Sequence, residues 1–336
     1  MRDRLDCAVI FPFAEYRMSN QETPMTESID ATEPTKHSGF VGLVGLPNAG
    51  KSTLMNGALQ VKLSIVSNKP QTTRNRILGV LNAPNLQVAL VDTPGIHRAR
   101  GRMHSTMVQA AKDTIGEVDA ACWVVDASWL IKKGQVMPAE TIFSKGLKYM
   151  ANLLEKEKNL VVVLNKIDLF PKHLLLPLMA IFQERLPQAH LVPLSAKNKD
   201  GLEVLFEVFK QVLPEGEPLY PDDVLTDQTE RFLAAERIRE KVFLLTNQEV
   251  PYSVAVEIQG FKETPKRTEI YARIWVEKES QKGILIGKKG AKIKMIGSQA
   301  RQELQELFGR RLHLDLIVSV RDNWSNDPRR LRELGF

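Results

Sequence analysis

Hydrophobic and polar positions follow two different patterns along this chain. Between residues 39 and 213, short apolar runs alternate with longer segments in which apolar residues recur every three or four positions. Short apolar runs are typical of strands buried on both faces, and the longer repeat is typical of helices. The alternation predicts an α/β fold with a doubly wound, mostly parallel sheet, and the turn NAPN predicts one antiparallel edge. The expected strands are 40–45, 76–81, 86–92, 121–127, 160–165 and 190–195, and the expected helices begin near 51 and cover 104–117, 139–157, 174–186 and 201–213.

The second pattern begins after LPEGEPLYPDD (213–223), a stretch with three prolines and several acids that reads as a linker. Beyond it the order becomes helix, strand, strand, two helices hinged at GKKG, and strand, which predicts a separate α+β domain. The expected elements are a helix over 227–247, strands over 252–261, 268–277 and 313–320, and the helix pair between the last two. We therefore divide the chain into domains at 38–213 and 227–336, with 214–226 as the linker.

Residues 1–37 fit neither pattern. Their apolar run, CAVIFPF, is short for a secretory signal and no small-residue cleavage site follows it. We interpret the segment as a disordered extension or as an artefact of start-site assignment, with Met18 or Met25 as the alternative start.

Composition limits the class of protein without identifying it. The 336 residues are 43% hydrophobic and 26% charged, which is ordinary for a soluble globular protein. The net charge of +6 permits a polyanionic partner but does not require one. Cys7 and Cys122 lie too far apart in sequence to indicate a disulfide framework, so a reducing compartment fits. No apolar stretch approaches the roughly 18 residues needed to span a bilayer.

The segment GLPNAGKST (45–53) matches the pattern G-x-x-x-x-G-K-[ST], after an expected strand and before an expected helix. In that context, backbone N–H groups of the loop and helix start point at nucleotide phosphates. Lys51 would reach the β- and γ-phosphate oxygens, and Ser52 would offer an oxygen to Mg²⁺. The predicted phosphate-binding residues are Gly45, Leu46, Pro47, Asn48, Ala49, Gly50, Lys51, Ser52 and Thr53.

Three further motifs, VDTPG, NKID and SAK, follow at the carboxyl ends of expected strands, where open α/β sheets bind ligands. Asp92 could hold Mg²⁺ through a water, and the N–H of Gly95 could contact the γ-phosphate. The carboxylate of Asp168 can accept hydrogen bonds from the N1–H and 2-amino groups of guanine, donors that adenine lacks. The predicted γ-phosphate segment is Asp92, Thr93, Pro94, Gly95 and Ile96, and the predicted guanine site is Asn165, Lys166, Asp168, Ser195, Ala196 and Lys197.

These motifs resemble those of the translation-factor-related small GTPases, and GLPNAGKST, PQTTRNRI (70–77) and DTPGIH (92–97) resemble the Era family in particular. The resemblance implies that PQTTR is switch I, in which Thr73 (or Thr72) would bind Mg²⁺ beside GTP, together with Ser52 and Asp92. It also implies that 93–104 is switch II. Many GTPases carry a water-orienting glutamine where this chain has Ile96, so we expect slow intrinsic hydrolysis.

Asn48 has two readings. In related GTPases with the pattern G-x-P-N, this asparagine helps to hold a K⁺ ion against the phosphates, where the ion would neutralise developing charge. Alternatively, Asn48 only stabilises the turn of the loop.

The second glycine loop, GKKG (287–290), lacks both a preceding strand and a following K-[ST], and it lies between two helical segments. Gly287 and Gly290 would let a nucleic-acid backbone come close. The surrounding element order resembles a type II KH domain, whose G-x-x-G loop clamps about four nucleotides of single-stranded RNA. Residues 266–311 hold twelve Lys or Arg against five Glu, a net charge of +7. The predicted RNA-binding residues are Ile286, Gly287, Lys288, Lys289, Gly290, Lys292 and Lys294, with Ile284, Ile286, Ile293 and Ile296 in the groove or core below; the alternative is a plain helix–turn–helix with a solvated basic face.

The Era resemblance covers about 39–336, including the tail WSNDPRRLRELGF. It implies a bacterial GTPase that binds the 3′ end of 16S rRNA and assists 30S subunit assembly. It also implies a cytoplasmic protein with some peripheral attachment to the inner membrane. We expect a monomer without a DNA partner, and we expect the nucleotide state to change RNA affinity through the switch loops.

Three alternatives remain at this point. One is an RNA-binding scaffold whose first domain holds nucleotide but is catalytically weak. A second is a tRNA-modifying or membrane-transport GTPase, which the lack of spanning segments and of a C-terminal cysteine disfavours. The third, an ATPase, is opposed by NKID.

Overall fold

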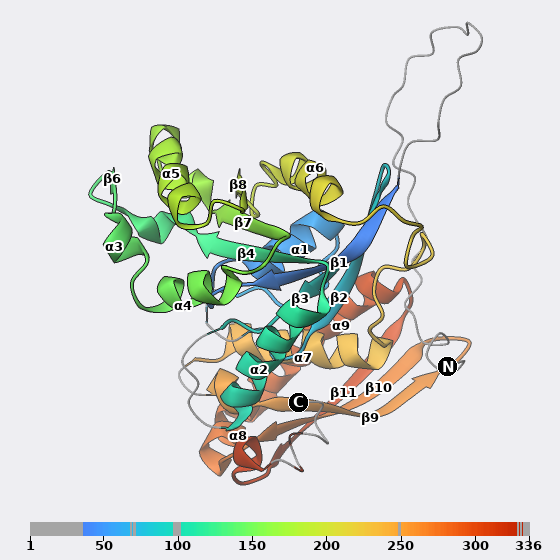
Figure 1. Cartoon of the computed structure of the whole chain (residues 1–336). Coiled ribbons are helices and arrows are strands. Elements are labelled where there is room, and N and C mark those ends of the chain that lie inside the picture. Colours follow the sequence, from blue (N-terminus) through green and yellow to red (C-terminus); the bar gives the residue numbers. More distant parts are fainter. Residues whose placement is uncertain are drawn as a thin grey trace, which may run out of the picture.

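The computed structural model describes residues 36–67, 69, 72–96, 102–247, 250–327, 329 and 331. Four predictions therefore lie wholly or partly outside the described residues: the extension before residue 36, part of PQTTR, switch II over 97–101, and the end of the tail. The described residues form two layered domains, and helix α7 (Glu230–Leu245) of the second domain lies where the two meet (Figure 1).

The first domain is built on a six-stranded sheet in the order β2-β3-β1-β4-β7-β8. β2 runs antiparallel to β3, and the remaining neighbours are parallel. This arrangement confirms the predicted α/β fold with one antiparallel edge. β1 begins at His37, inside the segment that the sequence assigns to the extension. The strands are β1 (His37–Val44), β2 (Ile77–Ala83), β3 (Leu86–Asp92), β4 (Ala120–Asp126), β7 (Leu160–Asn165) and β8 (His190–Leu194).

Helices cover both faces of this sheet, as a doubly wound fold requires. α1 (Lys51–Leu59) and α6 (Leu202–Val212) pack into one apolar cluster, and α2 (Arg102–Glu117), α4 (Lys145–Leu154) and α5 (Leu175–Arg185) pack into another. The single helix predicted over 139–157 is wrong, because the chain breaks at Phe143 into α3 (Ala139–Ile142) and α4. A short hairpin, β5 (Ile131–Lys132) and β6 (Gln135–Val136), was not predicted; it turns at Lys133 and Gly134, both with positive φ. No helix in the described part of the chain combines the length and hydropathy needed to cross a bilayer.

The second domain has a three-stranded sheet in the order β11-β10-β9. β9 and β10 form an antiparallel hairpin, whereas β11 runs parallel to β10 after the crossover through α8 and α9. The buried side of this sheet packs on the three helices around Ile238, Ile274 and Ile296. The α+β order is therefore as predicted. Its elements are α7 (Glu230–Leu245), β9 (Ala255–Glu263), β10 (Thr268–Val276), α8 (Glu279–Ile286), α9 (Ala291–Phe308) and β11 (Leu312–Val320).

The proline-rich segment between the domains lies against the edge strand β2. The N–H of Val80 donates to the carbonyl of Leu225 at 2.8 Å, and the hydroxyl of Thr226 donates to the carbonyl of Leu78 at 2.5 Å. Val224 is buried with Val80 and residues of β3. The segment thus covers an otherwise open sheet edge and fixes where α7 starts.

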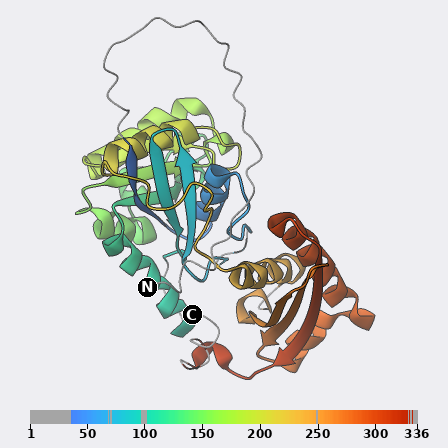
Figure 2. The same cartoon turned by 90° about the vertical axis from the view of Figure 1, so that its right-hand side faces the viewer.

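The two domains share one apolar cluster. Leu59 and Leu63 of the first domain belong to the same buried group as Leu233, Leu304 and Leu307 of the second. Figure 2 shows α7 and the end of α9 turned toward the first domain. The two domains are therefore joined by a continuous hydrophobic core, which extends from one domain into the other.

Candidate functional site

A cavity of about 610 Å³ opens at the carboxyl end of the first sheet. It lies where β1, β3 and β7 end, beside the point at which the strand order reverses. Residues of all four predicted motifs, and of the segment before β2, line it. The predicted residues that line it are Pro47, Asn48, Gly50, Lys51, Ser52, Thr53, Thr72, Thr73, Gly95, Asn165, Lys166, Asp168, Ala196 and Lys197.

The glycines of the loop after β1 are required by their surroundings. At Gly45, with φ of 150°, a Cβ would lie 2.4 Å from the carbonyl oxygen of Val124. At Gly50, with φ of 101°, a Cβ would lie 2.2 Å from Nδ2 of Asn165. Any side chain at either position would push the loop away from β4 or β7. The loop can therefore start α1 at Lys51, with the helix N-terminus directed into the cavity.

Lys51 is 6% exposed, and its ammonium donates to the carbonyls of Gly45 and Leu46 at 3.2 Å each. Burial lowers the pKa of Lys51 to about 8, against an opposing effect of the Asp92 carboxylate. A partly desolvated ammonium of this kind gains strongly from an anionic ligand. Its position suits phosphate oxygens.

Three oxygen-bearing side chains meet next to Lys51. The hydroxyl of Ser52 lies 2.7 Å from Asp92 Oδ2 and 2.9 Å from the hydroxyl of Thr73, which is 3.3 Å from the same carboxylate oxygen. Asp92 is fully buried, burial raises its pKa, and its Oδ1 has no hydrogen-bond partner among the described residues. A buried carboxylate with a spare oxygen, beside two hydroxyls, fits a hard divalent cation such as Mg²⁺.

Asn165 lines the cavity, and its side chain also connects the surrounding loops. Its Nδ2 donates to the carbonyl of Ala49 at 2.8 Å, and its Oδ1 accepts from the N–H groups of Lys166 and Ala196. One buried amide thus ties together three of the four motifs. Lys166 adds a second brace, since its ammonium contacts the carbonyl of Asn48 and the carboxylate of Asp126.

Asp168 projects into the cavity from the turn after β7. Its Oδ1 accepts a hydrogen bond of 2.6 Å from the hydroxyl of Ser195, which itself accepts from the N–H of Asn198. Ser195 is fully buried and does not line the cavity. It holds the carboxylate of Asp168 in a fixed orientation.

The segment after β3 is divided between two roles. Gly95 lines the cavity, and a Cβ there would lie 2.8 Å from the backbone nitrogen of Pro47. Thr93 instead donates its hydroxyl to the carbonyl of Leu43, and Ile96 is 2% exposed within the core. The side chain of Ile96 therefore points away from the cavity.

Several cavity residues were missed from the sequence. Trp129 is 66% exposed in the turn after β4, and Leu169 is 61% exposed in the turn after β7. Both are large apolar side chains just beyond the carboxyl end of a strand, a position that could have marked them. Ile65, Val66 and Ser67 also line the cavity, and no pattern distinguishes them.

The second glycine loop lies on the surface at the junction of α8 and α9. Gly287, Lys289 and Gly290 have positive φ, and a Cβ on Gly287 would come within 2.8 Å of the Cβ of Lys292. Lys288 and Lys289 are exposed, as is Lys294 in the next turn. Of the isoleucines, Ile296 is in the core, Ile293 packs against it, and Ile284 is 39% exposed. The loop thus presents cationic side chains beside a close-approach backbone, in the manner expected of a nucleic-acid clamp.

Two protein-family models match separate parts of the chain. The model described as a 50S ribosome-binding GTPase matches residues 40–166, and the model described as a KH domain matches residues 249–325. The first contains the cavity motifs up to Lys166, and the second contains the GKKG loop.

Full-length relatives are also similar. The chain is 47% identical to GTPase Era of Syntrophus aciditrophicus over 301 residues, which are 89% of this chain and 95% of the relative. It is 46% identical to GTPase Era of Geobacter metallireducens, over 89% of this chain and 97% of the relative. Two crystal structures at 40% identity each cover 89% of this chain and 99% of their own. They are an Aquifex aeolicus Era variant bound to GDP and aluminium fluoride, with a TM-score of 0.80, and Era with MgGDPNP and nucleotides 1506–1542 of 16S ribosomal RNA, with a TM-score of 0.81.

Proposed function

The chain belongs to the Era family of GTPases, and we propose that it couples GTP hydrolysis in the first domain to binding of the 3′ end of 16S rRNA by the second, in assembly of the 30S subunit. The observation that carries this proposal is the convergence of four nucleotide-binding motifs on one cavity, in a chain that also presents an exposed GKKG loop. Residues 38–213 would be the G domain, 214–226 the linker and 227–336 the KH domain.

In the G domain, Lys51 and the backbone of Gly45–Thr53 would hold the phosphates, and Gly95 would contact the γ-phosphate. Ser52, Thr73 and Asp92 would hold Mg²⁺, directly or through water. When bound, the ion would neutralise charge on the β- and γ-phosphate oxygens. The support from this structure is the cluster of two hydroxyls and a buried carboxylate with one unpartnered oxygen.

Guanine would be read by the carboxylate of Asp168, with the backbone of Ala196 and Lys197 near the base oxygen. The N–H of Ala196 would be shared between that oxygen and Asn165 Oδ1, to which it donates in this structure. Lys166 and the exposed Trp129 would flank the base plane, since both line the cavity. Asn165 would act through the loops that it connects.

The water that attacks GTP has no partner in Ile96, whose side chain lies in the core. We propose that Asn48 helps to hold K⁺ against the phosphates and that the ion supplies part of the missing charge stabilisation. Asn48 lines the cavity with φ of 61°, a conformation that asparagine tolerates, so its turn-forming role is equally compatible. Hydrolysis rates in K⁺ and Na⁺ separate the two readings, because equal rates would leave only the turn.

In the KH domain, Gly287 and Gly290 would admit the RNA backbone, and Lys288, Lys289, Lys292 and Lys294 would contact phosphates. Ile286 would lie under the bases. The Era structure with nucleotides 1506–1542 of 16S rRNA supports this partner. We propose that the protein is a monomer and that it is cytoplasmic, the latter supported by the proposed ribosomal RNA partner. Peripheral attachment to the inner membrane is a further property to be tested by cell fractionation.

The test uses the full-length protein and two RNAs, the 3′ end of 16S rRNA and a scrambled strand of equal composition. We expect GTP hydrolysis that requires Mg²⁺ and tighter binding of the ribosomal strand. Equal affinity for both strands would remove the proposed partner. Nucleotide binding without any Mg²⁺-dependent hydrolysis would favour the scaffold alternative.

A further inference from the structure

Three consecutive residues of switch I connect the two domains. The side chain of Thr73 faces the cavity and contacts Ser52 and Asp92. The residues on either side of it, Thr72 and Arg74, are held by the KH domain. The magnesium-facing threonine is therefore suspended between two contacts that belong to the other domain.

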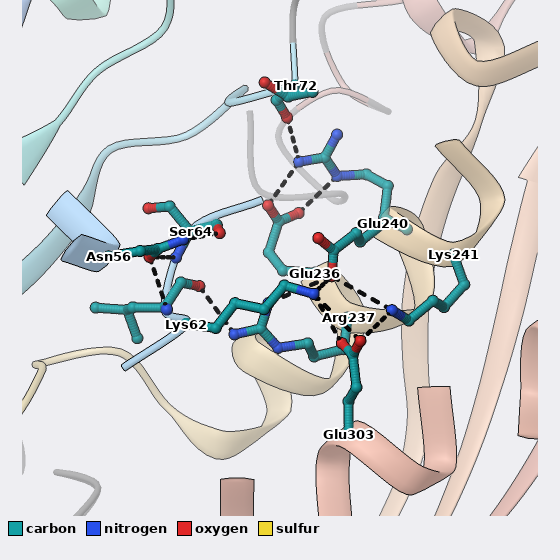
Figure 3. Close-up of polar contacts among 11 residues, drawn as sticks. Asn56, Lys62, Ser64, Thr72, Glu236, Arg237, Glu240, Lys241 and Glu303 are labelled. Carbon is teal, nitrogen blue, oxygen red and sulfur yellow. Dashed lines mark hydrogen bonds and ion pairs between the residues drawn. The ribbon is translucent and has the colours of Figure 1, made fainter. Parts of the chain in front are cut away.

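The first contact comes from Arg239 on α7. Its Nη2 donates to the carbonyl oxygen of Thr72 at 2.6 Å. The guanidinium is 3% exposed and is oriented by two hydrogen bonds to Glu236, at 2.7 and 2.6 Å, and by the ring of Phe243 at 5.6 Å. Because Glu236 and Phe243 fix the plane of the guanidinium, the remaining N–H of Nη2 can point only toward Thr72. Figure 3 shows Thr72 at the end of this chain of contacts, above Glu236.

The second contact runs the opposite way. Arg74 extends from switch I into the KH domain and donates to the carbonyl oxygens of Pro251, Tyr252 and Val254, at 3.0, 3.1 and 2.5 Å. It lies over the same Phe243 ring at 5.9 Å. Each domain thus inserts one buried arginine into the other, and both arginines meet at one aromatic ring.

We propose that Arg239 is a positioning residue for the nucleotide site: by holding the carbonyl of Thr72 it sets the backbone that presents Thr73 to Mg²⁺, with Arg74 as the second anchor. This deepens the proposed function and rests on it, because it takes Thr73 as a magnesium ligand. No atom of Arg239 needs to touch nucleotide. The KH domain contributes to GTP binding by fixing the far side of switch I.

Electrostatics makes this contact conditional on the relative position of the domains. Arg74 and Arg239 are each 3% exposed, and both lie over the ring of Phe243. The two cations are tolerated only while the carbonyls and Glu236 surround them. If the KH domain moved away, Arg74 would lose the carbonyls of Pro251, Tyr252 and Val254, and Arg239 would lose the carbonyl of Thr72 while keeping Glu236 on its own helix. Thr72 and Arg74 would be released in one step, and by reciprocity a ligand that orders Thr73 would favour the docked KH domain.

The competing explanation is that Arg239 only stabilises the domain interface. The same helix offers a matched control in Arg237, which is 2% exposed. Arg237 also pairs with a glutamate three residues away and also points at a carbonyl of the first domain, but that carbonyl is Leu63, at 3.4 Å. Figure 3 shows Arg237 within the separate ion network of Lys62, Glu240, Lys241 and Glu303. Replacing it perturbs the interface and leaves Thr72 held.

The experiment measures how much Mg²⁺ tightens binding of a non-hydrolysable GTP analogue to full-length protein, by comparing dissociation constants in Mg²⁺ and in EDTA. The variants are Arg239→Gln, Arg237→Gln, Glu236→Gln and Thr73→Ala, and urea unfolding reports the stability of each. We expect Arg239→Gln to reduce the Mg²⁺-dependent tightening by about tenfold, the effect of losing roughly 1.4 kcal/mol. Its affinity in EDTA should match wild type. Arg237→Gln should keep the full tightening whatever stability it loses.

Glu236→Gln leaves Arg239 in place without its orienting carboxylate, so an intermediate loss is expected even if Arg239→Gln folds poorly. The inference is overturned if Arg239→Gln retains wild-type tightening, or if Arg237→Gln loses as much as Arg239→Gln. A different result, full tightening in Thr73→Ala, would show that Thr73 is not a magnesium ligand and would overturn that part of the proposed function as well. The two failures are therefore distinguishable.

Discussion

Replacing Asp168 with asparagine should invert the base preference of the nucleotide site. The hydroxyl of Ser195 accepts a hydrogen bond from the N–H of Asn198 and donates its proton to Asp168. In the variant, this donor can be met only by the carbonyl oxygen of the new amide, so the NH₂ group must turn toward the base. An NH₂ group there opposes the N1–H and 2-amino donors of guanine, and it matches the 2-oxo acceptor of xanthine.

The magnitude follows from the bonds exchanged. The carboxylate can accept two charge-assisted hydrogen bonds from guanine, each worth about 1.5–3 kcal/mol. Their loss should weaken GTP binding by about 10²–10⁴-fold, at about 1.4 kcal/mol per factor of ten. Stability should change little, because the hydrogen bond from Ser195 is kept.

The assay is displacement of a fluorescent guanine nucleotide by GTP and by XTP, for wild type and for Asp168→Asn. Ser195→Ala in the Asp168→Asn background is the control, since it frees the amide to rotate. We expect XTP to bind the single variant more tightly than GTP does, and the added Ser195→Ala change to narrow that difference. Unchanged GTP affinity in Asp168→Asn would refute the assignment of Asp168 as the guanine reader.

Three further predictions concern separate parts of the chain. Gly50→Ala should abolish nucleotide binding in a dialysis assay, because the new Cβ would lie 2.2 Å from Nδ2 of Asn165 at a positive φ. Burial acts to raise the pKa of Glu303, but hydrogen bonds from Lys241 and Lys62 outweigh burial and lower the pKa below 4.5. The ionised Glu303 therefore stabilises the fold above that pH, and this contribution is lost on acidification. Between neutral pH and about pH 3, the unfolding free energy of Glu303→Gln should fall less than that of wild type. Replacing Lys288 and Lys289 with aspartate should weaken RNA binding. The slope of log K against log[salt], measured by titration at several salt concentrations, should become less steep by about 0.7 per lost phosphate contact.

Two of these predictions have a matched control. Gly116→Ala adds a Cβ that meets nothing within 4 Å and should bind nucleotide normally. Aspartate at the exposed Lys156 and Lys158 makes the same change of net charge in the G domain, and it should leave the RNA salt dependence as it is. For Glu303, parallel acid losses in wild type and variant would count against its role.

The sequence predicted those parts of the nucleotide site that depend on local geometry. A strand followed by GLPNAGKST and a helix has one way to direct the backbone at phosphates, and VDTPG, NKID and SAK end strands of the same parallel sheet. The order of these motifs was enough to predict that they lie at one edge of the sheet. It was not enough to predict the contacts that each side chain makes at that edge. Asn165 is an example, since its bonds to Ala49 and Ala196 join loops that are distant in sequence.

The domain interface lay beyond prediction for a physical reason. Charged and apolar residues are interspersed around α7, and charged side chains of a helix normally lie in solvent. In the fold five of the charged residues are buried instead: Glu236, Arg237, Arg239, Glu240 and Lys241 are each less than 10% exposed. Nothing in the sequence of one helix shows that a second domain will cover its charged residues. The sequence also did not show that the linker would pack on β2, because the hydrogen bonds between them join residues about 145 positions apart.

The buried charges at the domain interface also explain why the contact between the two domains suits a switch. Removing a charge from water costs several kcal/mol even after relaxation, and interactions with a partner must offset that cost. The apolar cluster around Leu63 and Leu304 does not involve switch I, whereas Arg239 on α7 needs the carbonyl of Thr72, and Arg74 of switch I needs the carbonyls near Pro251. If switch I left its position, Arg239 would lose the carbonyl of Thr72 and Arg74 would lose the carbonyls near Pro251. Two buried guanidinium groups would then lack acceptors, and hydration would favour separation of the domains. A wholly apolar interface would not respond to such a displacement, so we expect these two buried arginines to make domain contact depend on the conformation of the nucleotide site.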